Sequence, residues 1–279
     1  MSANVSFLAV GVPNADAHQY VAVYRLISNE EWELLRTEIT EDYGDRVVFG
    51  TIVDLSADGM AVTAGSVYSQ GLLGQTQVFA GQARIFTLES DQWLPKRPAL
   101  FGALCRSLGC SIVLSGDANR RAVSTSDVFG SGNCHDDFFD KRGQVQILDY
   151  GADTRTWVQS GKNLTGRRPG SFFVGVSVAR SRDGKRVAVS SPDRSDLGVN
   201  TIFHASEQSG STSGQWQQGD SSIIVEISEF YTPRGVALSA DGKRVAAASK
   251  RFVYGAASVC QDSRVDGCEV GAAWQKHCG

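Results

Sequence analysis

The chain has 279 residues, of which 42% are hydrophobic and 20% are charged, as in an ordinary folded domain and unlike a disordered chain. Its formal net charge of −3 at pH 7 lacks the basic excess of a phosphate-binding surface, so we expect no nucleic-acid partner. No apolar run reaches the length of about 18 residues that a membrane helix needs, so we also expect no membrane span.

A repeating unit begins at the first residues of the chain. Ser2–Pro13 aligns without a gap on Ser181–Pro192, which puts Asn4 in the place of Asp183. Four further units carry a phrase close to Leu-Ser-x-Asp-Gly, at Leu55–Gly59, Leu114–Ala118, Arg180–Gly184 and Leu238–Gly242. The anchors near positions 4, 58, 117, 183 and 241 are 54 to 66 residues apart, a period typical of repeat architectures.

Each complete unit contains the pattern of four short strands. The first precedes the turn (51–55, 111–114, 174–178, 235–238), and the second follows it (61–64, 121–124, 187–190, 245–248). A third strand alternates with aromatic residues (21–25, 83–87, 145–150), and a fourth carries Trp32, Trp93, Trp157 or Trp216. We expect Asp-Gly to form a type I′ hairpin turn, because both residues tolerate positive φ angles.

These patterns predict an all-β chain. Period-two alternation and frequent turns exclude a helical solenoid, and radial sheets of four strands predict a β-propeller-like array with about four complete blades and one partial blade. We expect five valines of the second strands to be buried between blades: Val62, Val123, Val187, Val189 and Val245. We expect the small residues of the same strands to line the axis and leave no room for catalysis: Ala61, Ala122, Ala188 and Ala246.

The order Phe-Gly, Leu-Ser-x-Asp-Gly-x-Arg-Val-Ala-Val, x-Pro, Gly-x-Val-x-Val-Tyr and Trp resembles FG-GAP-type repeats, the blades of integrin-α-like β-propellers. The residues that carry the resemblance are Phe49-Gly50, Phe173 with Gly175, Pro13, Pro192 and Gly143–Ile147. The stretch Phe101–Gly109 departs from the pattern as an insertion, and Pro233 replaces the glycine of Phe-Gly. TolB-like and lactonase-like propellers share the turn phrase, but the Phe-Gly and Trp elements favour the first family.

The resemblance covers residues 1–255, and residues 256–279 form a Cys-containing segment that we expect to be irregular. Because residue 1 falls inside a unit, three explanations stay open: a piece of a longer protein such as a seven-bladed propeller, a truncated gene model, or a ring closed by unusual strand exchange. We expect the first of these.

The six cysteines gather outside the expected strand centres, which favours disulfides in an exported protein over buried thiols. We therefore expect an extracellular or cell-surface location, although the N-terminus lacks a signal-peptide pattern. A zinc site from Cys105, Cys110, Cys134 and His135 is the weaker alternative, because tight Cys-x2-Cys pairs are missing.

Calcium is the one cofactor that the resemblance suggests, because integrin-type blades hold it in the loop after the second strand. The candidate ligands are Asp193 with Asp196, and Asp136 with Asp140. None of these loops has the full Asp-x-Asp-x-Asp-Gly run, so a solvated polar loop is the simpler interpretation and we expect no obligatory cofactor.

No nucleophile elbow, zinc-protease motif or phosphate loop occurs, and the four histidines share no motif. We therefore expect no enzyme, but a non-catalytic propeller for adhesion or for recognition of a protein or glycan through loops on one face. The alternatives are a propeller enzyme of lactonase or hydrolase type and a purely structural repeat segment. A cluster of carboxylates or histidines with perturbed titration at the axis would favour the enzyme.

Overall fold

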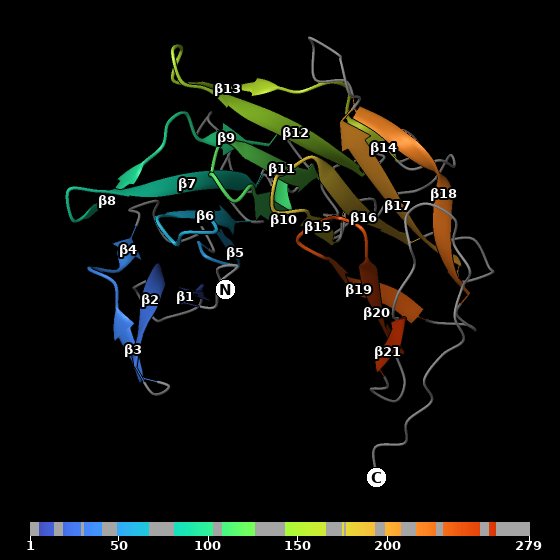
Figure 1. Cartoon of the computed structure of the whole chain (residues 1–279), viewed down its shortest axis with the longest axis horizontal. Coiled ribbons are helices and arrows are strands. Elements are labelled where there is room, and N and C mark those ends of the chain that lie inside the picture. Colours follow the sequence, from blue (N-terminus) through green and yellow to red (C-terminus); the bar gives the residue numbers. More distant parts are fainter. Residues whose placement is uncertain are drawn as a thin grey trace, which may run out of the picture.

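The computed structural model describes residues 6–13, 19–28, 31–40, 49–66, 81–102, 108–125, 143–165, 175, 177–192, 199–207, 216–226, 231–251 and 257–260. These residues form five antiparallel sheets that follow one another around an open arc (Figure 1). The described residues contain no helix, and hence none that could cross a membrane. The predicted all-β propeller fold is confirmed.

The first blade consists of β1 (Phe7–Val12), β2 (Tyr20–Ser28), β3 (Glu31–Leu34) and β4 (Ile39–Thr40). The second blade consists of β5 (Ile52–Leu55), β6 (Ala61–Ser66), β7 (Gln82–Glu89), β8 (Gln92–Pro95) and β9 (Leu100–Phe101). The third blade consists of β10 (Leu108–Leu114), β11 (Arg120–Thr125), β12 (Gln144–Gly151), β13 (Thr156–Gln159) and β14 (Leu164–Thr165).

The fourth blade consists of β15 (Val178–Arg180), β16 (Arg186–Pro192), β17 (Val199–Glu207) and β18 (Trp216–Glu226). The fifth blade consists of β19 (Tyr231–Leu238), β20 (Val245–Arg251) and β21 (Ala257–Cys260). The middle three blades have the full path of four strands in chain order, and short strands β4, β9 and β14 pair with the third strand of their blades. The first blade begins at the second-strand position, as the alignment of Ser2–Pro13 predicts.

The hairpin turns fall where the sequence predicts them, but their type differs from the prediction. Gly59 has φ +75°, and its N–H donates to the Ser56 carbonyl. Asp58, the other central residue of the turn, does not have a positive φ. A type I′ turn requires positive φ at both central residues, so the type I′ prediction is wrong. The aspartate instead acts through its side chain, which accepts hydrogen bonds from Ser56 Oγ (2.6 Å) and the Met60 N–H (2.9 Å).

The same hydrogen-bonded turn recurs in four blades. The serine hydroxyl donates to the aspartate Oδ1 at 2.6 Å in every copy, and it also accepts the N–H of the residue five positions further along the chain. Four aspartates take this role: Asp58, Asp117, Asp183 and Asp241. The Ser-x-Asp phrase is therefore a turn-forming device, as the sequence suggests.

The first strands, not the second, are innermost. In Figure 1, β5, β10, β15 and β19 lie on the inner side of the arc, and neighbouring first strands are linked directly: the Val178 N–H donates to Ser111 Oγ and the Val236 N–H to Ser177 Oγ, both at 3.0 Å. The prediction that second-strand alanines line the axis is wrong. These strands are crowded because both of their faces are covered by neighbouring blades.

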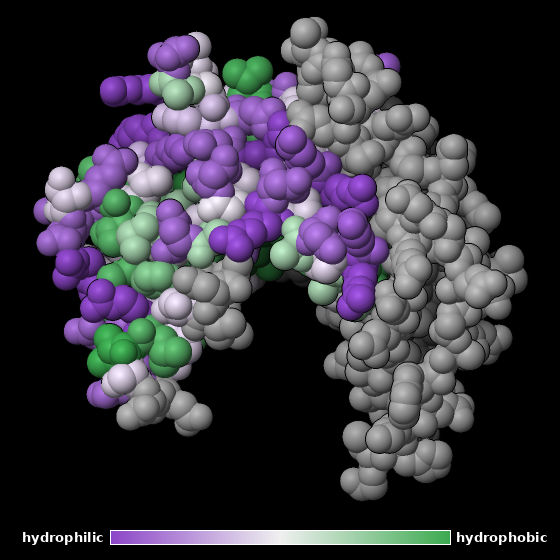
Figure 2. Space-filling model, viewed as in Figure 1, coloured by the Kyte–Doolittle hydropathy of each residue, from purple (hydrophilic) through white to green (hydrophobic). Residues whose placement is uncertain are grey.

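The core is divided into four clusters, one at each junction of consecutive blades. The second-strand valines predicted to be buried are all in them, with exposures between 0% and 8%. On the face shown in Figure 2, hydrophobic residues gather over the first blade, which carries the exposed side chains of Leu26, Ile27 and Leu34. Each middle blade is thus stabilised from both sides, and the first blade leaves apolar surface exposed.

The Phe-Gly element brings adjacent blades into close contact. Phe49 is buried and Gly50 has φ +81°, and a Cβ on the facing Gly11 would lie 1.9 Å from the Gly50 carbonyl oxygen. In the third blade the equivalent residues are Leu108-Gly109. Gly109 precedes Leu114 by five residues, as Gly50 precedes Leu55, and it also has a positive φ, +90°. The element therefore persists in that blade, with leucine in place of phenylalanine, as the last two residues of the stretch Phe101–Gly109 that the sequence pattern assigns to an insertion.

A chain of backbone hydrogen bonds joins the turns of successive blades. The residue between serine and aspartate donates its N–H to the carbonyl of its counterpart in the next blade: Ala57 to Gly116 (2.9 Å), Gly116 to Arg182 (3.0 Å) and Arg182 to Ala240 (2.9 Å). These bonds fix four turns next to one another at one end of the inner strands.

Candidate functional site

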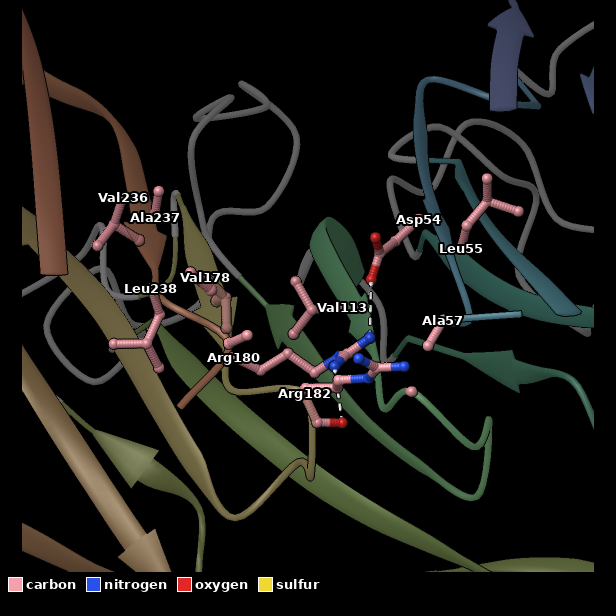
Figure 3. A pocket seen from close by; sticks show the side chains of 13 residues that line it. Asp54, Leu55, Ala57, Val113, Val178, Arg180, Arg182, Val236, Ala237 and Leu238 are labelled. Atoms are coloured by element: carbon pink, nitrogen blue, oxygen red, sulfur yellow. Dashed lines mark hydrogen bonds and ion pairs between the residues drawn. The ribbon is translucent and has the colours of Figure 1, made fainter. Parts of the chain in front are cut away.

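A pocket of about 470 Å³ lies on the inner side of the arc, in the hollow visible in Figure 2. Its walls come from the first strands and the inner turns of four blades (Figure 3). The lining residues are Asp54, Leu55, Ala57, Val113, Gly116, Val178, Ala179, Arg180, Arg182, Val236, Ala237, Leu238 and Ala240. We call this the axial pocket. Most of its surface residues are aliphatic, and its ionisable residues are Asp54, Arg180 and Arg182.

Asp54 is the carboxylate of the axial pocket. It lies on β5 with its side chain 28% exposed, and its Oδ2 accepts the backbone N–H of Leu114 from the next blade at 2.7 Å. Burial raises the pKa of Asp54 above the ordinary carboxyl range, and the opposing effects of Arg180 and the Leu114 N–H do not cancel the increase. Such a carboxyl binds a proton more readily than a solvated aspartate.

Arg180 approaches Asp54 from β15, two blades away along the arc. Its Nη2 is 3.9 Å from the Asp54 Oδ2, as the dashed line in Figure 3 marks, and its side chain is only 13% exposed. Nη1 donates to the Ser181 carbonyl at 2.9 Å, while the buried Nε has no hydrogen-bond partner among the described residues. Burial lowers the pKa of Arg180, and Asp54, Asp117 and Asp183 oppose this.

The two charges form an ion pair that is longer than a hydrogen bond. At 3.9 Å the groups attract one another but leave donor capacity on the guanidinium and acceptor capacity on the carboxylate. Because both side chains are mostly buried, their interaction with a bound molecule is stronger than it would be in water. The arrangement can accept a proton on one side and stabilise a developing negative charge on the other.

Both residues depart from the repeat, and that departure is the sequence signal for the site. Val113, Ala179 and Ala237 stand at the position equivalent to Asp54, whereas leucine occupies the Arg180 position in the other three units that carry the phrase. A consensus of the repeat units does not contain Asp54 or Arg180, because each occurs in one unit. The expectation that small apolar residues leave no room for a site at the axis is therefore wrong, because a pocket with ionisable residues lies there.

The metal candidates Asp136, Asp140, Asp193 and Asp196 lie outside the described residues, as do Cys105, Cys134 and His135 of the alternative zinc set. Cys110 is half-buried in β10. Within the described part of the chain, no three acidic, cysteine or histidine side chains gather as metal ligands would. The calcium site remains a prediction.

Comparison with known proteins agrees with the fold. No family model and no curated protein matches the chain. Among solved structures, it is similar to a periplasmic gluconolactonase, PpgL, from Pseudomonas aeruginosa (18% identity, 97% of this chain and 67% of that chain, TM-score 0.59). It is also similar to a hydrazine synthase chain from Kuenenia stuttgartiensis (15% identity, 95% and 70%, TM-score 0.56) and to the β-propeller domain of Cps50 (Swd1) from Myceliophteria thermophila (13%, 98% and 83%, TM-score 0.48).

The expectation that the chain is not an enzyme is contradicted by these similarities. The two similar chains with TM-scores above 0.5 bear the names of enzymes, and the described pocket contains a carboxyl group with a raised pKa at the axis. At these identities the similarity shows the β-propeller fold and no more. The prediction failed because it was drawn from missing motifs, and propeller sites are assembled from residues on separate blades.

Proposed function

We propose that the protein is a propeller hydrolase that opens a small cyclic ester, a lactone, in the axial pocket. The observation that supports this most is the pairing of Asp54 and Arg180 across a largely aliphatic pocket. The cavity of about 470 Å³ lies in the usual range of small-molecule sites, roughly 300–1,000 Å³. The similarity to a gluconolactonase is consistent with the substrate class without establishing it.

Asp54 acts as the general base in this proposal. Its carboxylate takes a proton from a water molecule, the water oxygen attacks the lactone carbonyl carbon, and the carbonyl oxygen becomes an oxyanion. Arg180 stabilises that oxyanion through its charge, because its guanidinium is held by the Ser181 carbonyl and its Nη2 faces Asp54 in the pocket. The ring C–O bond then breaks, and the leaving alkoxide takes the proton from Asp54 to give a hydroxy acid.

The raised pKa of Asp54 suits this role. A carboxylate of higher basicity is a better proton acceptor, provided that it is ionised at the working pH. The Leu114 N–H, donated from the adjacent blade, holds the carboxyl group in place during the proton transfer.

The test is hydrolysis of a panel of aldono- and other γ- and δ-lactones by the Asp54→Asn variant, measured as acid release above the spontaneous rate. Asparagine keeps the size and an acceptor for the Leu114 N–H but removes the base. We expect kcat/KM to fall by about 10²–10⁴-fold. The matched control is Asp153→Asn, an exposed aspartate outside the pocket, which should leave kcat/KM within about twofold. Equal turnover by Asp54→Asn and the parent chain would refute the assignment.

The pH profile provides a second check. Because Asp54 must be ionised to act as a base, kcat/KM should decrease as the pH falls through the raised pKa of Asp54, above the ordinary aspartate value of about 3.9. A profile that stays flat down to about pH 4 would contradict a carboxylate base with raised pKa.

We also propose that the blades are related to FG-GAP-type repeats, with residues 1–255 as the repeat region and an extracellular or cell-surface location. The paired glycines at the Phe-Gly element support the first of these proposals. A glycan is the partner class compatible with the pocket, since its sugar units include uronic acids and, once released, give lactones on oxidation. The location is tested by fractionating cells that express the native gene and measuring how much of the protein is in the medium, on the cell surface and inside the cell.

A further inference from the structure

The charges of the axial pocket are unequal. Its lining contains two guanidinium groups, of Arg180 and Arg182, and a single carboxyl group, that of Asp54. The pKa of Asp54 is raised by burial, so its ionised form is less favoured than that of a solvated aspartate. We propose that the ligand of this pocket carries an anionic group, a carboxylate, in addition to the ester, and that Arg182 binds it. The presence of an ester in the ligand rests on the hydrolase proposal, whereas the binding of an anion by Arg182 does not.

Arg182 is placed for this role by its backbone rather than by its side chain. Its N–H donates to the Ala240 carbonyl and its carbonyl accepts the Gly116 N–H, so the main chain is fixed between two neighbouring turns. The residue is exposed, and it borders the pocket. A fixed backbone beneath a solvent-accessible guanidinium is a suitable arrangement for capturing an anion.

The repeat shows that arginine is not needed here for the fold. The equivalent positions of the other turns are Ala57, Gly116 and Ala240, which take part in the same chain of backbone bonds without a charged side chain. Arg182 is thus the third ionisable residue in the pocket and the third departure from the repeat, together with Asp54 and Arg180. These departures converge on one cavity, which structural repetition alone does not explain.

Nearby acidic residues do not neutralise the excess positive charge of the axial pocket. Asp117 and Asp183 influence Arg180 at a distance, but their carboxylates are held in the turns by Ser115 and Ser181 and do not line the pocket. With Asp54 as the only acid in the lining, a ligand carboxylate would find two guanidinium groups and one carboxyl group. Arg180 would then serve the reacting ester and Arg182 the remote anion.

The binding test uses a matched pair of sugar derivatives with the full chain. Titration calorimetry with D-glucuronate and with D-glucuronamide compares an acid with its neutral amide of nearly the same shape. We expect the acid to bind about tenfold more tightly or better, and Arg182→Gln to remove most of that preference. Lys185→Gln removes the same charge from an exposed residue of the same turn that does not line the pocket, and should preserve it.

The kinetic test uses glucaro-1,4-lactone, which has a free carboxylate, and the neutral glucono-1,4-lactone. The ratio of their kcat/KM values should favour the acid, and Arg182→Gln should lower that ratio about tenfold. If neither lactone is hydrolysed but glucuronate binds in preference to the amide through Arg182, the hydrolase proposal fails and the anion site is supported. Equal affinity for acid and amide, or an equal ratio in Arg182→Gln and Lys185→Gln, would overturn the inference.

Discussion

At the scale of single residues, Arg121 is a buried charge that lowers the stability of the folded state. It is fully buried between the second and third blades, and none of its three guanidinium nitrogens has a hydrogen-bond partner among the described residues. The equivalent residue of the three other blades that carry the Ser-x-Asp turn is a buried valine: Val62, Val187 or Val245. Burial lowers the pKa of Arg121 to about 9, and the face of Trp157, 4.1 Å away, compensates in part.

We therefore predict that Arg121→Val stabilises the protein. Replacing a poorly paired buried ion by a well-packed apolar residue is expected to raise the free energy of unfolding by about 1–4 kcal/mol. Urea titration followed by far-UV circular dichroism measures this. Lys162→Val, a change at an exposed cation, should remain within about 0.5 kcal/mol of the parent. A destabilised Arg121→Val would mean that the guanidinium is better satisfied than its contacts indicate.

At the scale of elements, the Ser-x-Asp turn combines stability with pH dependence. Burial alone would raise the pKa values of Asp117 and Asp183, but hydrogen bonds from the serine hydroxyl and the backbone outweigh it and lower both. The hydrogen bond from Ser239 is the main cause of the lowered pKa of the solvent-exposed Asp241. A lowered pKa in the folded state means that the stabilisation is present above the unfolded value, about 3.9, and is lost as the pH falls through the folded value.

The corresponding prediction is that Asp183→Ala lowers the free energy of unfolding by about 1 kcal/mol at pH 7, because two hydrogen bonds of a partly exposed group are lost. The loss should shrink as the pH is lowered through the folded pKa, since the carboxylate of the parent chain is then protonated. Thermal unfolding between pH 7 and pH 3 compares the two, with Asp153→Ala as the control. A loss independent of pH would show that charge plays no part in the turn.

Sequence patterns are most informative where the repeat is regular. The turns and the buried valines are predicted because Ser-x-Asp-Gly and period-two alternation act locally, within one hairpin. The turn type is missed because the aspartate works through its carboxylate and not through its φ angle. Asp54 and Arg180 are missed because they belong to different blades and meet only when the inner strands are stacked around the arc.

At the scale of the whole molecule, side chains of the inner strands hold the blades together. Ser177 Oγ accepts the Val236 N–H of the fifth blade, and Ser111 Oγ accepts the Val178 N–H of the fourth. These bonds add to the four apolar clusters at the blade junctions and link the strands that line the pocket. The inner wall is thus continuous across blades although no sheet spans two of them.

We predict that Ser177→Ala loosens the fifth blade selectively. Loss of one partly buried acceptor, worth about 1 kcal/mol, should speed hydrogen exchange in the peptide around Val236 about fivefold, with little change around Val178. Ser111→Ala should show the reverse. The two variants act as controls for one another, and a uniform increase in both would indicate global unfolding instead.

The backbone chain that joins the turns also bears on how such a pocket changes during evolution. The contacts between neighbouring turns use main-chain atoms at positions 57, 116, 182 and 240, and the same four residues line the pocket. Gly116 is tightly enclosed, since an added Cβ would lie 3.0 Å from the Arg182 carbonyl oxygen. The other three positions already carry side chains, so drift or selection can exchange them without losing the blade contacts. If the proposed site binds a ligand, its preference is therefore separable from foldability, and we expect single substitutions at these positions to change it.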